Sequence, residues 1–165
     1  DVLDISKIES GMVFFAYTDV YLPSAMRDMY NIMQLRMPEN VELILDPCPD
    51  IMIRTDNNRM VQILSNLLTN AIKHTSCGSI RFGYTLEGDH VHFYVSDTGK
   101  GIPEKELDHI FGRFVQLKGA YNGIGLGLAI SKGLVNKMGG EISVSSKVGE
   151  GSTFRFTLPL ANILS

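Results

Sequence analysis

Residues 58–75 read NRMVQILSNLLTNAIKHT, a segment in which apolar residues recur at the spacing of a helix. They surround most of the helix and are Met60, Ile63, Leu64, Leu67, Leu68, Ala71 and Ile72. A helix that is apolar almost all round is expected to lie in the core of a domain. Asn66 and Asn70 nevertheless share one line along it, which Lys73 and His74 continue.

This polar seam needs partners, because an unpaired buried polar group is costly. One interpretation is a ligand site, in which amide oxygens point at a hydrated metal and the Lys73 ammonium points at a phosphate. The other interpretation is hydrogen bonding between the helix and a neighbouring loop. The helix alone does not decide between them.

Alternating apolar residues on both sides of this helix predict short strands. The predicted strands are residues 13–22, 41–45, 51–53, 80–84, 91–95, 141–146 and 152–160. Further helices are predicted at residues 1–11, 22–37, 104–111 and 125–138. Gly88-Asp89 is typical of a hairpin turn, and Pro38 is expected to end a helix at Met37. This order predicts an α+β domain, a largely antiparallel sheet with helices packed on one face.

The composition is that of an ordinary globular protein, with 44% apolar and 20% charged residues among 165. A net charge of -3 leaves no basic surface for nucleic acid or anionic membranes. No apolar stretch approaches the roughly 20 residues that span a bilayer. Cys48 and Cys77 lie far apart without a CxxC partner, which argues against a zinc site and suits a reducing compartment.

A second signal is DTGKGI, residues 97–102, which directly follows a predicted strand. A carboxylate at the end of a strand can accept a hydrogen bond from an exocyclic amine such as that of adenine. The two glycines allow the backbone to approach a ligand closely. Taken alone, this pattern fits a plain turn or a calcium-type loop equally well.

A third signal is GIGLGL, residues 123–128, at the beginning of a predicted helix. Glycines before a helix N-terminus present backbone amides and the positive end of the helix dipole, which suits a phosphate. The pattern is similar to a dinucleotide-binding fingerprint, but no strand leads directly into it. The strand-turn-helix context of a Rossmann fold is therefore absent.

Together, the three segments resemble the asparagine box and two glycine boxes of the histidine kinase family of two-component systems. The family's phenylalanine motif fits Phe111 and Phe114. Its closing pattern of glycines, a small hydroxyl residue and phenylalanine fits residues 149–154. Residues 1–11, DVLDISKIESG, are similar to the end of the second helix of the family's dimerisation and phosphoacceptor domain.

The resemblance implies a Bergerat-type two-layer α/β sandwich, with a mixed and mostly antiparallel sheet of about five strands. Three main helices would cover one face, and residues 99–125 would form a long ATP lid. The expected domains are residues 1–11, the end of the dimerisation helix, and residues 12–165, the ATP-binding catalytic domain.

The resemblance also implies which residues bind ATP and Mg²⁺. Asn70 would be the magnesium ligand, supported by Asn66, while Lys73 would contact phosphate and His74 would line the adenine. Asp97 would accept a hydrogen bond from the adenine amino group. The other implied nucleotide contacts are Gly99, Gly101, Ile102, Phe114, Lys118, Gly123, Gly125, Leu126, Gly127, Leu128 and Thr153. Among these, residues 125–128 would cap the phosphates, and Thr153 would sit near the adenine.

The implied function is to bind Mg-ATP and donate its γ-phosphate to a histidine of the dimerisation domain, for relay to an aspartate of a response regulator. None of the 4 histidines is followed by an acidic residue, as the family's phosphoacceptor is, so that histidine is expected outside this sequence. No residue of the chain is assigned a catalytic role with certainty. The whole protein is expected to be a homodimer, with this domain in the cytoplasm of a membrane-anchored bacterial sensor.

Two alternatives share the fold. A gyrase-type ATPase would place a glutamate four residues before the metal-binding asparagine, as the base that activates water. This sequence has Asn66 there, and an amide cannot take up that proton, which favours phosphoryl transfer. A pseudokinase module would bind nucleotide only to regulate shape, and the presence of all the nucleotide-binding motifs argues against it.

Overall fold

The computed structural model describes residues 7, 8, 10–112 and 127–161. Its elements are β1 (Thr18–Tyr21), α2 (Leu22–Gln34), β2 (Val41–Leu45), β3 (Met52–Thr55), α3 (Asn57–His74), β4 (Gly78–Glu87), β5 (His90–Asp97), α4 (Glu104–Leu107), α5 (Gly127–Lys137), β6 (Ile142–Lys147) and β7 (Gly151–Pro159). Five strands form one sheet in the order β2-β4-β5-β7-β6, and β1 pairs with β3 separately. β2 runs parallel to β4, and the other neighbours in the larger sheet are antiparallel.

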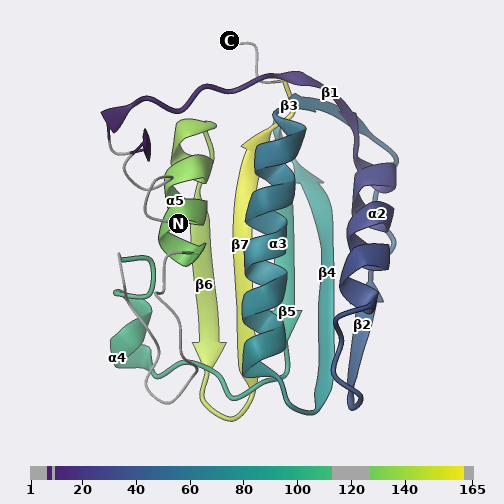
Figure 1. Ribbon diagram of the computed structural model, residues 1–165, viewed down its shortest axis with the longest axis vertical. Coiled ribbons are helices and arrows are strands. Elements are labelled where there is room, and N and C mark those ends of the chain that lie inside the picture. Colours follow the sequence, from purple (N-terminus) through teal and green to yellow (C-terminus); the bar gives the residue numbers. More distant parts are fainter. Residues whose placement is uncertain (1–6, 9, 113–126, 162–165) are drawn as a thin grey trace.

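Helices α2, α3 and α5 lie side by side on one face of this sheet, with α3 in the middle (Figure 1). The predicted two-layer sandwich with a mostly antiparallel five-stranded sheet and three main helices on one face is therefore confirmed. The helical residues of the seam lie within α3, whose carboxylate N-cap Asp56 accepts a hydrogen bond from Arg59 N at 3.0 Å. An N-cap of this kind stabilises a helix by about 1 kcal/mol.

The core lies between the sheet and the helices. α3 contributes five apolar side chains that are at most 1% exposed, namely Met60, Ile63, Leu64, Leu67 and Leu68. Burial of each stabilises the fold by roughly 1.5–3 kcal/mol. Alternate residues of the central strands face them, and the rings of Phe93 and Phe156 stack with centroids 4.6 Å apart. The period-2 pattern of these strands was therefore a reliable signal of the buried face.

Several predicted boundaries differ in the structure. The predicted extended segment at residues 13–22 is a strand only at Thr18–Tyr21, α2 ends at Gln34 although the apolar stripe continues to Met37, and the helix predicted at residues 104–111 ends at Leu107. Arg36 N donates to Met33 O at 2.9 Å, so the chain tightens into a turn after Gln34. Pro38 prevents Met37 from continuing the helix, and the turn begins three residues before the proline.

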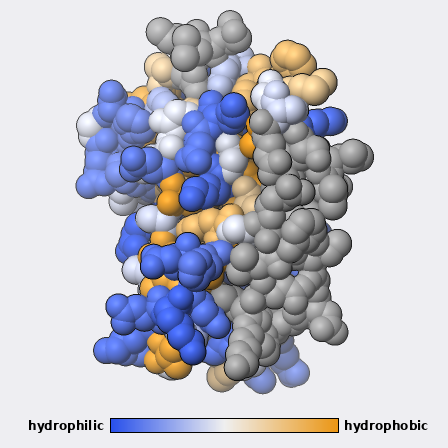
Figure 2. Space-filling model, turned by 90° about the vertical axis from the view of Figure 1, so that its left-hand side faces the viewer, coloured by the Kyte–Doolittle hydropathy of each residue, from blue (hydrophilic) through white to orange (hydrophobic). Residues whose placement is uncertain are grey.

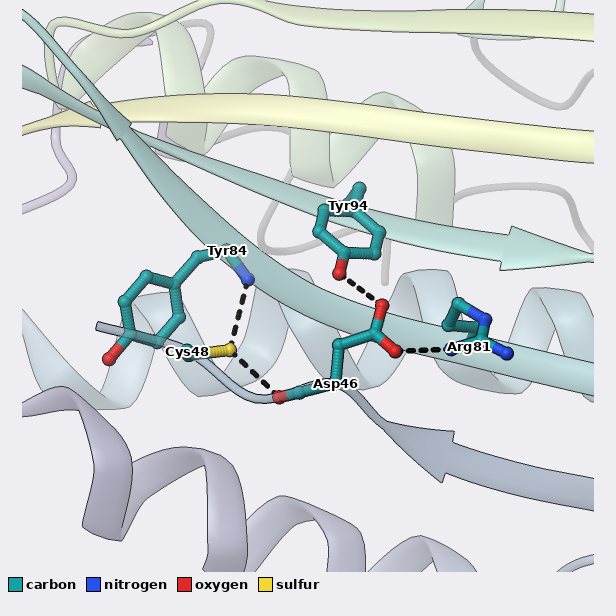
Figure 3. A network of polar contacts seen from close by, with 5 residues as sticks. All are labelled: Asp46, Cys48, Arg81, Tyr84 and Tyr94. Atoms are coloured by element: carbon teal, nitrogen blue, oxygen red, sulfur yellow. Dashed lines mark hydrogen bonds and ion pairs between the residues drawn. The ribbon is translucent and has the colours of Figure 1, made fainter. Parts of the chain in front are cut away.

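A polar network holds the segment after β2 against the sheet (Figure 3). The Asp46 carboxylate accepts hydrogen bonds from Arg81 and Tyr94, and Cys48 Sγ donates to Asp46 O at 3.1 Å. A Cβ on Gly83 would lie 2.8 Å from Tyr94 Oη and 3.2 Å from Cys48 Sγ, so only glycine leaves room for the tyrosine. Burial and the bond to Asp46 raise the pKa of Tyr94. Tyr84 N also donates to Cys48 Sγ at 3.4 Å, so the segment follows β4 beyond the end of β2.

The side of the molecule formed by α4, α5 and β6 is largely hydrophilic over the described residues (Figure 2). Apolar side chains reach this surface in separate areas between hydrophilic ones. Within residues 7–8, 10–112 and 127–161, no helix has both the length and the apolar character that crossing a bilayer demands.

A first prediction concerns the glycine pair that ends α5. Gly139 has φ +86, and a Cβ on Gly140 would lie 1.8 Å from Thr157 O, a backbone atom that cannot move aside. We expect Gly140→Ala to lower the free energy of unfolding by about 3 kcal/mol. Gly88→Ala is the control, because Gly88 has φ +61 but no atom within 4 Å of the added carbon. It should cost about 1–2 kcal/mol. Urea denaturation measures both, and equal losses would contradict the prediction.

Candidate functional site

The polar seam of α3 faces the beginning of α5. Asn66 Nδ2 donates to Gly127 O at 3.2 Å and to Ser131 Oγ at 3.3 Å. Ser131 is fully buried, and the sequence analysis had not singled it out. A Cβ on Gly127 would lie 3.8 Å from Asn66 Cγ, so the two residues are in van der Waals reach. This amide nitrogen therefore bonds to another helix, α5, and not to a neighbouring loop.

The rest of the seam leads to the C-terminal end of α3. Asn70 is buried with 7% of its surface exposed, Lys73 is exposed, and His74 is buried. Desolvation, together with the positive charges of Lys100 and Lys73, lowers the pKa of His74 to about 4. The imidazole is therefore neutral at pH 7, and it can present an uncharged ring to a ligand.

Asp97 is the last residue of β5 and is only 5% exposed. Its Oδ1 accepts a hydrogen bond from Gly99 N at 2.9 Å. Desolvation raises the pKa of this carboxyl, and backbone hydrogen bonds from Gly99 and Ser152 partly oppose the rise. Asp97 is therefore a buried carboxylate at the end of a strand, and its role as acceptor for an adenine amino group stays a prediction.

The glycines after Asp97 bring the backbone close to other parts of the protein. A Cβ on Gly99 would lie 2.1 Å from His74 O, and one on Gly101 would lie 2.2 Å from Lys147 O. Gly101 also has φ +76, which favours glycine. Ile102 is 2% exposed, and the loop is thus wedged between the end of α3 and the β6–β7 hairpin. These contacts join the Asp97 loop to the seam of α3.

Thr153 lies on the face of the sheet that points away from the helices. Its Oγ1 lies 2.8 Å from Ser96 Oγ, on the neighbouring strand. The buried hydroxyl residue opposite Asp97 is instead Ser152, which is 7% exposed. The alternation of β7, in which Phe154 also faces the helices, was a signal for Ser152 that the sequence analysis missed.

Other predicted contacts fall at or beyond the edges of the described residues. The rings of Phe111 and Phe154 meet edge to face with centroids 6.2 Å apart, and Lys132 Nζ lies 5.9 Å from the Phe111 centroid. Leu128 is half-buried in the first turn of α5. The predicted contacts outside the described residues are Phe114, Lys118, Gly123, Gly125 and Leu126. Residues 113–125, about half of the predicted lid, also lie outside them.

The donor set of the site suits magnesium that is held jointly with phosphates. In the part of the chain that the structure describes, no group of 3 or more His, Cys, Asp or Glu side chains could hold a metal. The predicted ligand Asn70 would offer one amide oxygen, and Mg²⁺ usually takes one or two protein oxygens together with substrate phosphates and waters. The residues present therefore fit a magnesium ion that arrives with a nucleotide.

The fold is a two-layer sandwich. Its central helix carries the asparagine seam, a buried aspartate ends one strand, and a glycine begins the flanking helix. Together these features are typical of a Bergerat-type nucleotide-binding domain. The model of the "Histidine kinase-, DNA gyrase B-, and HSP90-like ATPase" family matches residues 55–162. The chain belongs to this family. The predicted division of the chain between residues 11 and 12 stays a prediction, because the family match begins only at residue 55.

The chain is also similar to a sensor protein and to solved structures that include a histidine kinase catalytic domain. The aerobic respiration control sensor protein ArcB of Escherichia coli K12 is 40% identical, over 96% of this chain and 22% of ArcB. The crystal structure of full-length ShkA in complex with AMPPNP has a TM-score of 0.88 and 32% identity, over 99% of this chain and 35% of that one. The catalytic domain of histidine kinase ThkA has a TM-score of 0.79 and 25% identity, over 90% of this chain and 98% of the ThkA chain. The chain spans about a fifth of the length of ArcB.

A second prediction follows from the neutral His74. The unfolded chain binds a proton at this residue near its ordinary pKa of 6.5, whereas the folded chain does so only near 4. The unfolded state therefore holds more protons between these values, and stability is lost as the pH falls from about 7 toward 4. We expect the urea midpoint to fall between pH 7 and pH 5, and to fall less in His74→Phe, which cannot titrate. An equal fall in both proteins would contradict the assignment.

Proposed function

We propose that the chain binds Mg-ATP and donates its γ-phosphate to a histidine on a dimerisation domain of the same sensor kinase, for relay to an aspartate of a response regulator. The observation that carries this proposal is the contact between the asparagine seam of α3 and Gly127 at the beginning of α5. Gly99, which donates to the buried Asp97 and lies against the end of α3, brings Asp97 to the same seam. The proposal includes a homodimeric whole protein and a cytoplasmic location for this domain.

At the adenine end, Asp97 would accept a hydrogen bond from the purine amino group. Its burial supports this role, because a carboxylate shielded from water loses more when the matching donor is absent. Ser152 replaces Thr153 as the hydroxyl residue that the proposal places beside the base, since it lies opposite Asp97. The neutral ring of His74 would line the same pocket.

At the phosphate end, Asn70 would hold the metal and Lys73 would contact a phosphate. Gly127 and Leu128 would present backbone amides at the positive end of the α5 dipole. Magnesium, when bound, would offset charge on the phosphates. The protein's contribution to transfer is then positioning and electrostatics, which is usual for phosphoryl transfer.

A third prediction separates the two ends of the site. Asp97→Asn should weaken ADP and ATP binding about tenfold or more and reduce discrimination against GTP, because an amide can present a donor where the carboxylate only accepts. Asn70→Ala should instead reduce the effect of magnesium on affinity. Calorimetric titrations with ATP and GTP, with and without Mg²⁺, measure both changes. Asp108→Asn, at an exposed position, controls for the lost charge.

If Asp97→Asn changed only the response to magnesium, the assignment of Asp97 to the base would be wrong. If the unmodified chain bound neither ATP nor ADP, the proposed function would fail altogether.

The contacts of Asn66 support a kinase rather than an ATPase. Gyrase-type ATPases need a carboxylate at this position to act as base toward water. Here the side chain donates through Nδ2 to Gly127 O and Ser131 Oγ, and a carboxylate cannot donate either bond. A glutamate would also place a negative charge beside a carbonyl oxygen at the point where phosphates are proposed to bind.

A fourth prediction tests this choice. We expect the unmodified chain to release phosphate from ATP far more slowly than about one per second. Asn66→Glu should weaken ATP binding rather than raise hydrolysis, because it breaks the tie to α5 and repels phosphate. Gln62→Glu adds the same charge one turn earlier on α3 and should change affinity little. Steady-state phosphate release and ATP titration measure these effects, and turnover of one per second or faster would favour an ATPase.

A further inference from the structure

The chain enters the domain along one end of the helical layer, where it crosses toward β1 (Figure 1). We call residues 7, 8 and 10–17 the N-terminal strap. Its helical part ends as predicted at Gly11, which has φ +73, and Met12 N donates to Lys7 O at 2.9 Å. The strap then runs extended, with Val13 and Phe15 packed on the core and Phe14 86% exposed between them.

The first attachment of the strap is to α5. Ile8 is 9% exposed, and its side chain fills the space that the missing side chain of Gly133 leaves on the helix. A Cβ on Gly133 would lie 2.7 Å from Ile8 Cγ2 and 3.3 Å from Ile8 Cδ1. Glycine in the middle of a helix costs about 0.5–1 kcal/mol relative to alanine. Gly133 therefore makes α5 less stable but leaves room for the Ile8 side chain.

The second attachment is to α3. Ala16 N donates to Asp56 Oδ2 at 2.8 Å, while Asp56 Oδ1 accepts from Arg59 N in the first turn of α3. Asp56 is 6% exposed, so one buried carboxylate both caps the helix and holds the strap. Hydrogen bonds to charged groups are among the stronger ones in proteins, which makes this a firm attachment.

The strap therefore bridges the same two helices that Asn66 joins through Gly127 and Ser131. We propose that docking of the strap on α3 and α5 is thermodynamically coupled to nucleotide binding in the site that these helices form. Both events favour one relative placement of α3 and α5, so each strengthens the other, and the coupling is reciprocal. The strap thus lets the upstream segment regulate nucleotide affinity. This inference rests on the proposed function.

Gly133→Ala tests the coupling by pushing Ile8 off α5. We expect ADP affinity to fall about fivefold or more, the range of ordinary coupling energies. Adding Ile8→Ala removes Cγ2 and Cδ1 and leaves only Ile8 Cβ, which is 3.6 Å from the new carbon, an ordinary contact. The double variant should therefore bind ADP more tightly than Gly133→Ala alone. Asn136→Ala, at an exposed position of α5, controls for helix propensity and should bind ADP normally.

Trypsin cleavage after Lys7 reports on the strap itself. ADP should slow this cleavage in the unmodified chain and have little effect in Gly133→Ala. If Gly133→Ala does not fold, Ile8→Ala alone should still reduce the protection that ADP gives. Unchanged ADP affinity in Gly133→Ala, or cleavage that ADP does not affect, would overturn the coupling while leaving the proposed function intact. Failure of the unmodified chain to bind ADP would overturn both.

Discussion

The amide of Asn66, held between α3 and α5, is the interaction on which the candidate site depends. Its net contribution to stability is about 0.5–1.5 kcal/mol, well below the roughly 1.5–3 kcal/mol of each buried apolar side chain of α3. Apolar burial therefore holds α3 on the sheet, and the role of the amide is to position α5. It ties the beginning of α5 to the seam, because its Nδ2 donates to both Gly127 O and the buried Ser131 Oγ.

The candidate site contains positive charges although the net charge of the chain is -3. Desolvation lowers the pKa of His74 most, and the positive charges of Lys100 and Lys73 lower it further. The cations that would attract phosphate therefore also help to keep the imidazole neutral. Desolvation raises the pKa of Asp97, which is buried at the end of β5. The proposed site thus combines cations near the end of α3 with a buried hydrogen-bond acceptor.

The glycines of the chain serve different physical purposes at different points. Gly99 and Gly101 let a loop press against His74 O and Lys147 O, and Gly83 leaves space for the Tyr94 ring to reach Asp46. Gly133 instead leaves a hollow in a helix that another part of the chain fills. Gly99 and Gly101 position the candidate site, whereas Gly133 receives the Ile8 side chain of the N-terminal strap.

The sequence alone determined the layers, the strands, the buried helix α3 and the place of Asp97, because each follows from a local pattern of period 2 or 3.6. The alternation of β7 also indicates that Ser152 faces the helices, whereas the family resemblance implied Thr153 near the adenine. Only the tertiary structure decided that Asn66 donates to Gly127, 61 residues away, and that Ile8 fills the space at Gly133. Contacts between distant segments depend on how helices settle against each other, and no local periodicity records that placement.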